Sequence, residues 1–415
     1  MSPKYTIIIP VYNGMPYLKA CIESVLNSEF ANFELIVSND HSIDGGDGYL
    51  SNIKDPRIKY IKPINRLSMT EHWEWALSKS SGEWIMFLGQ DDGVQSYFFE
   101  LAELLTEQAK NLNLKIINSR RAYYFWPGCE FKYGDIRVSY SAQNKMSVKS
   151  CFYSSIKALA GMSYHELPQM YTNSMFHRDL IERAKFLQGG EVFRCHPQDA
   201  NLAALATSLE SHYLRCEVPL GWVGSSPKSA GLAISSAEDS QVRVGVEIKN
   251  LRNEYIKKIN SSNLKYHRLA GVFSLNLGSI YYWQALLSTR SLRSGYLNNL
   301  IRSKIFLLFL FASAWIKETG AAKNSKREEF INLLRLNTIS IVMFRFSYLA
   351  LCLLASLRWI LVLLLIRVPN RLMKYIRGDE VIYVVPISDS DLTMRSATLN
   401  VDRKIRLSFK ELFIK

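Results

Sequence analysis

The chain of 415 residues has few of the residues that interrupt regular structure, with 21 glycines and 12 prolines, and it contains no low-complexity tract and no internal repeat. Hydrophobic residues make up 48% of it and charged residues 21%. This composition excludes disordered and collagen-like classes of protein and is typical of a globular one. The length predicts two or three domains and is too great for a mini-protein held together by disulfides.

Cysteine motifs and a secretion signal are also missing. The six cysteines are scattered along the chain without a C-x-x-C pair. The first residues lead directly into an apolar strand, without the hydrophobic region of a secretory signal peptide. We therefore expect a reducing, cytoplasmic environment.

Acidic residues are outnumbered, with 37 Asp and Glu against 51 Lys and Arg, which gives a net charge of +14. Such a balance favours an anionic partner. Residues 301–415 hold 19 Lys and Arg against 9 Asp and Glu, so +10 of the charge lies in roughly the last quarter of the chain. Because this basic region is also the most apolar one, the pattern favours an anionic membrane surface and argues against nucleic acid as the partner.

The first hundred residues alternate between strand and helix patterns. The apolar run Tyr5–Val11 predicts a buried strand, and apolar residues at 3.6-residue spacing over 17–26 predict an amphipathic helix. Further units follow, with strands predicted at 33–38, 58–61 and 84–88 and a helix at 71–78. This order predicts an α/β fold with a doubly wound, mostly parallel sheet, which binds ligands beyond the carboxyl ends of its strands.

Two polar loops follow strands of this predicted sheet. Asp91 and Asp92 come after the strand at 84–88, and adjacent carboxylates suit Mg²⁺ or Mn²⁺. The alternative is that Asp-Asp-Gly is only a turn. Asp40 and Asp44 follow the strand at 33–38, where they either cap the next helix or bind a nucleotide base and ribose.

The order of these motifs resembles the opening of family 2 glycosyltransferases of the GT-A fold. The resemblance is dense over about the first hundred residues and thinner over the next hundred. It is carried by Ile7-Ile8-Ile9-Pro10-Val11-Tyr12-Asn13-Gly14, by Phe33-Glu34-Leu35-Ile36-Val37, by Asn39-Asp40-His41-Ser42-Ile43-Asp44-Gly45, and by Gly82-Glu83-Trp84-Ile85-Met86-Phe87-Leu88 leading into Asp91-Asp92.

The resemblance implies a nucleotide-sugar donor and a divalent metal, Mg²⁺ or Mn²⁺. It implies that Asp40 accepts a hydrogen bond from the base, in a nucleotide pocket that also includes Pro10, Tyr12, Asn13 and Asp91. It implies that Asp92, together with Asp91, holds the metal on the diphosphate. Family members often read Leu-Asp-x-Asp-Asp here, whereas this chain reads Leu88-Gly89-Gln90-Asp91-Asp92 and lacks the first carboxylate.

An inverting sugar transfer also needs a base beside the acceptor hydroxyl. The resemblance points to Asp199, which follows His196-Pro197-Gln198; the alternative is a first-turn helix acid. Glu191 is a second candidate base. His177 is a polar candidate that could equally be structural. Lys228 lies in the stretch 221–229, which is either a loop that closes over the donor phosphates or a linker.

A hydrophobic run covers residues 346–366, with a single charge at Arg358. Its 21 residues are long enough to span a bilayer. Basic residues flank it on both sides and both flanks favour the cytoplasm, so we expect a monotopic, interfacial helix. The alternative is a buried helix of a soluble domain. Two alternating stretches, 381–385 and 405–409, predict a small β tail.

These patterns predict four regions: a GT-A catalytic domain at 1–228, a helical region at 229–335, a membrane-associating segment at 336–378 and the β tail at 379–415. The resulting hypothesis is a metal-dependent, inverting glycosyltransferase of cell-surface polysaccharide synthesis, of the O-antigen or lipopolysaccharide type. It transfers a sugar from a nucleotide-sugar donor to a hydroxyl of a lipid-linked or oligosaccharide acceptor at the cytoplasmic face of the inner membrane. The alternative is a non-catalytic, membrane-bound scaffold of a polysaccharide-assembly complex.

Overall fold

The structure, a computed structural model, describes residues 2–126, 136–141, 145–159, 164–226, 277–289, 380–385 and 393–408. The predicted membrane-associating segment at 336–378 lies outside the described residues, and so does Lys228. In the described part of the chain, no helix is both long and apolar enough to cross a membrane.

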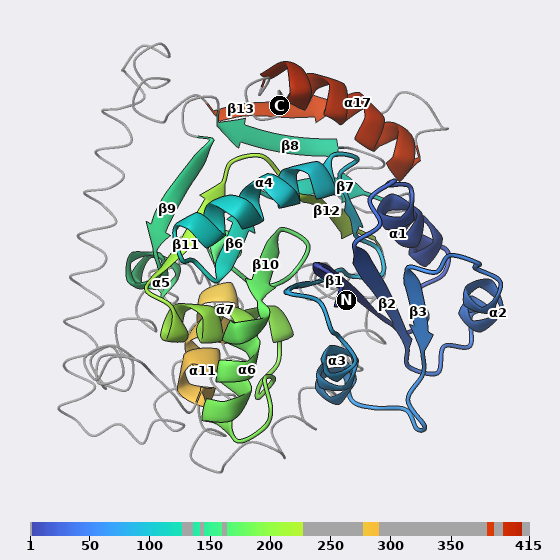
Figure 1. Ribbon diagram of the computed structural model, residues 1–415, viewed down its shortest axis with the longest axis horizontal. Coiled ribbons are helices and arrows are strands. Elements are labelled where there is room, and N and C mark those ends of the chain that lie inside the picture. Colours follow the sequence, from blue (N-terminus) through green and yellow to red (C-terminus); the bar gives the residue numbers. More distant parts are fainter. Residues whose placement is uncertain are drawn as a thin grey trace, which may run out of the picture.

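The larger of the two sheets formed by the described strands has the order β3-β2-β1-β4-β10-β6-β11-β9 (Figure 1). Its first four strands are parallel and match the predicted ones: β1 (Tyr5–Val11), β2 (Phe33–Asn39), β3 (Ile58–Ile61) and β4 (Trp84–Phe87). Beyond them, β10 (Ser174–His177) runs antiparallel to β4 and to β6 (Ile116–Ser119), and β11 (His212–Cys216) runs antiparallel to β9 (Met146–Ser150). The α/β prediction is confirmed, and the sheet is mixed.

Helices cover both faces of this sheet, because β1 is apolar on both sides. Ile7 and Ile9 belong to the hydrophobic cluster that includes α1 (Tyr17–Leu26) and α4 (Phe98–Asn111). Ile8 belongs to a second cluster on the other face, with α3 (Met69–Ser78), α6 (Arg178–Gln188) and α7 (Gln198–Leu209). Strands buried on both faces read as continuous apolar runs, as β1 and β2 do.

The second sheet has the order β13-β8-β7-β12-β5 and joins segments that are distant in sequence. It comprises β5 (Gly93–Val94), β7 (Ala122–Phe125), β8 (Ile136–Ser141), β12 (Gly221–Ser225) and β13 (Glu380–Val385). The other described helices are α2 (Gly46–Ser51), α5 (Cys151–Leu159), the 3₁₀ turn Tyr164–Glu166, α11 (Leu277–Ser288) and α17 (Met394–Ser408).

Two local predictions are wrong. Residues 221–225 form strand β12 instead of a flexible loop, since they pair with β7 and β5. The alternating stretch from Ile405 belongs to α17 as far as Ser408, whereas the predicted strand at 381–385 is confirmed as β13. Val401 and Ile405 lie four residues apart, and both are buried in the core, which is the spacing of one helix face.

The segment 229–335, predicted to be helical, contributes α11 to the described structure. This helix packs against α7 and α5 (Figure 1). The Tyr282 hydroxyl lies 2.7 Å from the hydroxyls of both Thr207 and Ser155. These contacts fix α11 against α5 and α7.

Candidate functional site

The carboxyl ends of β1 and β2 bring the predicted nucleotide pocket together. Asp40 N donates to Val11 O at 2.9 Å, Asn13 N donates to Ser42 Oγ at 2.9 Å, and Ile43 N donates to Asn13 Oδ1 at 2.9 Å. Asn13 has a φ of 52°, a left-handed conformation that asparagine tolerates better than most residues. The loops after the two strands are therefore cross-linked at the edge where parallel sheets bind ligands.

Asp40, which follows β2, is only 5% exposed. Its Oδ1 accepts a hydrogen bond from Leu67 N at 2.9 Å. The guanidinium of Arg66 lies 3.9 Å from the centre of the Tyr12 ring, which is a cation–π contact. His72 Nε2 lies 2.6 Å from Ser38 Oγ. Burial lowers the pKa of His72, and the negative charge of Asp40 acts in the opposite direction.

Gln90 connects this pocket to the loop that carries the two carboxylates. Its Oε1 accepts a hydrogen bond from Tyr12 N at 3.1 Å. A Cβ added at Gly14 would lie 2.5 Å from the same oxygen, so Gly14 leaves room for the Gln90 side chain. Pro10, at the end of β1, pairs with Ser38 of β2. No local pattern marks Gln90 as part of this site, because its partner Tyr12 lies 78 residues away in the chain.

Asp92 is buried and hydrogen-bonded on both oxygens. Its Oδ2 accepts from Gly89 N at 2.8 Å and from Thr172 Oγ1 at 2.6 Å, and its Oδ1 accepts from Gly224 N at 2.7 Å. Burial raises the pKa of Asp92, while these hydrogen bonds and one from Tyr171 oppose the rise. Asp92 thus joins the end of β4 to the 170–173 segment and to β12.

Glycine at position 89 follows from the same packing. A Cβ at Gly89 would collide with the Tyr171 hydroxyl and would lie 2.9 Å from Asp92 Oδ2. The position where the resembled family often carries its first aspartate is therefore next to a buried tyrosine hydroxyl in this chain. The Tyr171 hydroxyl therefore occupies the space that a side chain at position 89 would need.

Asp91 is less buried than Asp92 and is held by the second sheet. Its Oδ2 accepts a hydrogen bond from Ser226 Oγ at 2.7 Å, and its backbone oxygen accepts one from Trp126 Nε1 at 2.7 Å. A Cβ at Gly224 would collide with that backbone oxygen, so the close approach of β12 requires glycine there.

The donor set at this loop fits a metal held together with a bound diphosphate. Within the described ranges, no group of three or more His, Cys, Asp and Glu side chains is arranged to hold a metal ion. Mg²⁺ typically uses one or two carboxylates and completes its shell with substrate phosphates and water. Because three hydrogen bonds already point at the Asp92 oxygens, Asp91 is the better placed of the two carboxylates to bind an ion.

The segment that crosses the end of β4 has an unusual backbone. Thr172 has a φ of 40° and Met170 a φ of 48°, both in the left-handed region that a β-branched residue rarely adopts. Phe87 N donates to Met170 O at 2.9 Å, and Thr172 N donates to Phe87 O at 2.8 Å. These two hydrogen bonds hold the segment in this conformation. Such strain is concentrated at functional sites, and here it places Tyr171 and Thr172 against Asp92.

Asp199 lies in the first turn of α7. Its Oδ1 accepts from Ala200 N at 2.8 Å, and its Oδ2 accepts from the Tyr164 hydroxyl at 3.2 Å. Burial raises the pKa of Asp199, and the charge of Arg121 acts in the opposite direction. A general base works best when its pKa lies near the working pH, so a raised pKa suits a carboxylate for this role.

Tyr171 forms a hydrogen bond with the Asp92 carboxylate. Burial raises its pKa, and Asp92, Asp91 and Asp199 all raise it further through their charges. Trp73 of α3 stacks on the Tyr171 ring, and Gln198, the residue before Asp199, donates to Thr70 Oγ1 on the same helix at 3.1 Å. Helix α3 therefore contacts both the neighbour of the predicted metal loop and the start of α7.

The remaining candidates lie elsewhere or have structural contacts. His177 pairs with Trp84 at the amino end of β4, the opposite edge from Asp91, and its Nδ1 accepts from Asp179 N at 3.2 Å as the N-cap of α6. It has the structural role that was the alternative. Glu191 is exposed, and its backbone oxygen accepts from Gln188 Nε2 at 3.1 Å.

Comparison with known proteins agrees with this geometry. Open α/β sheets bind ligands beyond the carboxyl ends of their parallel strands, which is where the loops of Asp40 and Asp91 lie. Residues 6–157 match the model of the family described as "Glycosyl transferase family 2", so this part of the chain is a family 2 glycosyltransferase domain.

Several curated relatives match parts of the chain. A "GalNAc(5)-diNAcBac-PP-undecaprenol beta-1,3-glucosyltransferase" of Campylobacter jejuni is 34% identical over 97 residues, which is 23% of this chain and 31% of that protein. "Glycosyltransferase GlyA" of Streptococcus pneumoniae is 31% identical over 102 residues, or 24% of this chain and 14% of that protein. "Uncharacterized glycosyltransferase EpsJ" of Bacillus subtilis is 26% identical over 211 residues, or 49% and 56%. The matches span little more than half of these relatives at most.

Among solved structures, TarS 1–349 of S. aureus in complex with UDP-GlcNAc aligns with 79% of this chain and 92% of its own, at 14% identity and a TM-score of 0.46. A likeness of that size carries no inference about the reaction.

Proposed function

We propose that the protein is a metal-dependent, inverting glycosyltransferase that uses a nucleotide-sugar donor in polysaccharide synthesis. The observation that carries the proposal is that the loops after β1, β2 and β4 meet at one edge of the sheet, where Asn13, Ser42 and Gln90 join them through hydrogen bonds. The family 2 domain at residues 6–157 supports the same reaction class.

Each carboxylate has a separate task in this proposal. Asp40, with Tyr12 and Asn13, holds the nucleotide base. Asp91 faces the diphosphate, and Asp92 holds the loop in place through its hydrogen bonds to Gly89, Thr172 and Gly224. A bound Mg²⁺ or Mn²⁺ would supply positive charge to the leaving diphosphate.

Asp199 acts as the general base. It accepts the proton of the acceptor hydroxyl while that oxygen forms a bond to the anomeric carbon. The bond between the anomeric carbon and the diphosphate oxygen breaks, and its electron pair leaves with the nucleoside diphosphate. Attack from the face opposite the leaving group inverts the anomeric centre. The hydrogen bond from Tyr164 orients the Asp199 carboxylate for this step.

The acceptor that we propose is a lipid-linked glycan at the cytoplasmic face of the inner membrane. The name of the Campylobacter jejuni relative contains an undecaprenol diphosphate, which supports a lipid-linked acceptor. The charge of +10 over residues 301–415, next to the apolar run at 346–366, supports contact with anionic headgroups.

The donor site is tested first by melting temperature. Purified protein is screened against UDP, GDP, CDP and dTDP, each with and without Mn²⁺, because a ligand that binds the native state raises the melting temperature. We expect one nucleotide to stabilise the protein only with metal. We also expect Asp91→Asn to lose the stabilisation by nucleotide and metal. Asp179→Asn, at the opposite edge of the sheet, should keep it. If no nucleotide stabilises the protein, the non-catalytic scaffold becomes the better hypothesis.

A further inference from the structure

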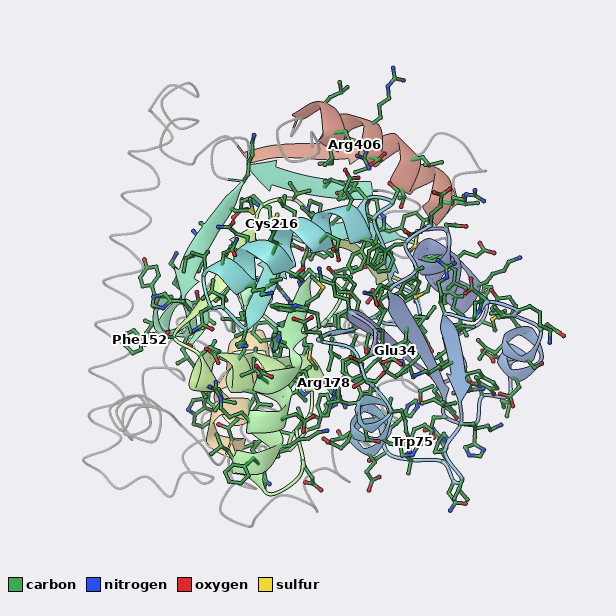
Figure 2. All side chains as sticks on the ribbon, in the orientation of Figure 1. Glu34, Trp75, Phe152, Arg178, Cys216 and Arg406 are labelled. Atoms are coloured by element: carbon green, nitrogen blue, oxygen red, sulfur yellow. The ribbon has the colours of Figure 1, made fainter. Side chains whose placement is uncertain are left out.

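Helix α5 has an exposed face that is aromatic and basic. Phe152 is 50% exposed and Tyr153 is 61% exposed, although both side chains are large and mainly apolar. In Figure 2, Phe152 lies at the left edge of the coloured ribbon. The Lys157 ammonium lies 4.7 Å from the centre of the Tyr153 ring, one helical turn away on the same face. The exposed face of α5 therefore combines two aromatic rings with a cation.

The residues around this face add positive charge and no negative charge. The stretch 145–159, which includes β9 and α5, contains Lys145, Lys149 and Lys157 but no aspartate or glutamate. Lys149 is exposed on β9, which is the last strand of the larger sheet among the described strands. Neither Lys149 nor Lys157 forms an ion pair with a residue that the structure describes. A surface of this composition attracts anionic groups.

The buried side of α5 packs against the elements that hold Asp199. Cys151 of α5 belongs to the hydrophobic cluster that also includes residues of α7. Helix α5 also contacts the 3₁₀ turn Tyr164–Glu166, and the Tyr164 hydroxyl donates to Asp199 at 3.2 Å. Helix α5 and the helix that carries the predicted base therefore lie on the same side of the larger sheet.

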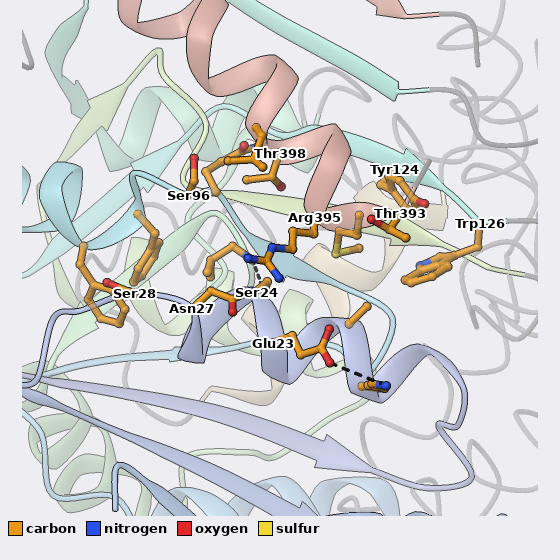
Figure 3. Close-up of a pocket in the computed structure, with 18 of the residues that line it drawn as sticks. Glu23, Ser24, Asn27, Ser28, Ser96, Tyr124, Trp126, Thr393, Arg395 and Thr398 are labelled. Carbon is orange, nitrogen blue, oxygen red and sulfur yellow. Dashed lines mark hydrogen bonds and ion pairs between the residues drawn. The ribbon is translucent and has the colours of Figure 1, made fainter. Parts of the chain in front are cut away.

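Other exposed apolar side chains have different surroundings. Phe186 of α6 is 85% exposed, but Glu182 lies one turn before it on the same helix. On the opposite side of the sheet, a pocket of about 620 Å³ opens between α1, the start of α4 and α17 (Figure 3). Its lining includes Lys19, whose ammonium lies 3.9 Å from the Glu23 carboxylate. Of these surfaces, that of α5 combines aromatic rings with lysines and has no acid on the same helix.

This combination fits an anionic lipid bilayer better than a protein partner or a soluble anion. Aromatic rings enter the boundary between headgroups and acyl chains, and lysines extend their ammonium groups to the headgroup phosphates. Interfaces between proteins are depleted in lysine. Lys149 on the edge strand β9 also discourages pairing with a strand of a second copy. A soluble anion would leave Phe152 and Tyr153 exposed to water.

We infer that the exposed face of α5, together with Lys149 of β9, docks on the anionic surface of a membrane. Phe152 and Tyr153 enter the headgroup region, while Lys149 and Lys157 contact headgroup phosphates. The purpose of this contact rests on the proposed function, because a lipid-linked acceptor reaches Asp199 from the membrane. Binding to lipid does not itself require the reaction, so the two can be tested separately.

The test measures sedimentation of the full chain with vesicles of phosphatidylglycerol and phosphatidylethanolamine, without donor or acceptor. Phe152→Glu should weaken binding about tenfold or more, because it removes a ring that enters the headgroup region and adds a repelled charge. The fold should tolerate this change, since the side chain is exposed and an acid in the first turn of a helix is favourable. Phe186→Glu, the matched change on α6, should leave the affinity for vesicles unchanged.

A charge variant tests the electrostatic part of the contact. Lys157→Gln should weaken binding to the same vesicles about fivefold, the usual contribution of one lysine near an anionic membrane. Added salt should reduce this difference, because it screens exposed charges. Lys19→Gln, on the other side of the sheet, should bind as the wild type does.

Chemical labelling locates the contact and separates it from binding by other parts of the chain. Vesicles should slow the acetylation of Lys149 and Lys157 by a water-soluble reagent and should leave that of Lys19 unchanged. The inference is overturned if the wild type does not bind vesicles, if Phe152→Glu binds them equally well, or if vesicles do not protect Lys157. A Phe152→Glu variant that loses self-association and keeps its affinity for vesicles would indicate a second copy as the partner and also overturns it.

The donor test remains independent of this one. Stabilisation by nucleotide with Mn²⁺ should be the same in Phe152→Glu as in the wild type, because Phe152 lies on the outer face of α5. Vesicle binding through α5 without any stabilisation by nucleotide would leave the membrane contact in place and contradict the proposed reaction. The reverse result would keep the reaction and remove the membrane contact.

Discussion

At the scale of single residues, Asp199 combines burial with a hydrogen bond from Tyr164. Its raised pKa means that the native state holds a proton on this carboxyl more tightly than the unfolded chain does. The stability that the group contributes is complete below the unfolded pKa and is lost as the pH rises through the folded pKa. The ionised form of this carboxyl, which the proposed base would need, is therefore less favourable for folding than the protonated form.

The first prediction concerns this trade between stability and activity. Asp199→Asn should reduce sugar transfer by about 10²- to 10⁴-fold, the usual contribution of a general base. At a pH above the folded pKa of Asp199 it should also raise the melting temperature, because the substitution removes a charge that burial disfavours. Initial rates and thermal unfolding of both proteins check this. In wild type, transfer should fall as the pH drops through the raised pKa of Asp199. Unchanged transfer by Asp199→Asn would assign the base to another residue.

The second prediction concerns Gly89. Gly89→Ala places a Cβ against the Tyr171 hydroxyl and Asp92, so we expect a loss of about 1–3 kcal/mol in the free energy of unfolding, as for other overpacked sites. Gly48→Ala is the matched control, because nothing lies within 4 Å of its added Cβ and it is in a helix. The control should gain up to about 1 kcal/mol from helix propensity. Denaturant unfolding measures both, and equal effects would contradict the steric reason.

At the scale of elements, α3 links the two halves of the site. His72 contacts Ser38 of β2 beneath Asp40. Thr70 Oγ1 accepts from Gln198 Nε2 at 3.1 Å, one residue before Asp199. Further along the helix, Glu74 Oε2 accepts from Val192 N and Phe193 N, both at 2.8 Å. One helix therefore contacts both the strand that leads to Asp40 and the segment that leads to Asp199.

The third prediction tests this link through Glu74. Glu74→Leu leaves two buried backbone N–H groups unpaired, at a cost of about 1–3 kcal/mol for each. It should lower both the melting temperature and the rate of transfer. Glu74→Gln keeps an oxygen acceptor and removes a carboxyl whose pKa burial has raised, so its melting temperature at pH 7 should equal or exceed that of wild type. If both variants lose stability equally, the hydrogen bonds to Val192 and Phe193 are not the reason.

At the scale of the whole molecule, the C-terminal helix α17 completes the fold of the N-terminal part. Met394, Val401 and Ile405 are buried in the same hydrophobic cluster as β1 and α1. The hydrogen bond from Trp222 to Thr398 joins residues 176 positions apart. In Figure 1, α17 lies next to β13 and above α1, so the two ends of the described chain are packed together.

The fourth prediction tests this closure. Thr398→Val keeps the volume of the side chain but leaves the buried indole N–H of Trp222 unpaired, so we expect a loss of about 1–3 kcal/mol. Leu407→Ala, on the exposed face of the same helix, should change stability by less than about 0.5 kcal/mol. Chemical denaturation compares the two. A single transition that shifts with Thr398→Val would show that α17 unfolds together with the core, whereas an unchanged transition would show that it does not.

Local patterns in the sequence were sufficient for β1 to β4, α1 and α3, because the apolar periodicity of each element is a property of a few neighbouring residues. The family resemblance supplied Asp40, Asp91, Asp92 and Asp199; the structure places the first three in loops after β2 and β4, and Asp199 in the first turn of α7. Their roles in base, metal and proton transfer stay predictions. The sequence by itself thus determined the α/β class of the N-terminal part and the acidic loops at its strand ends.

Only the tertiary structure decided what surrounds those loops. Tyr171, Thr172 and Gly224 contact the loop of Asp92 from 80 to 132 residues away, and no short-range period reports such partners. The alternating stretch that begins at Ile405 was predicted to be a strand and is part of a helix, since its pattern suits either structure and its burial against a distant core decides between them. Long-range contacts, which local sequence does not encode, fix the side chains around Asp92.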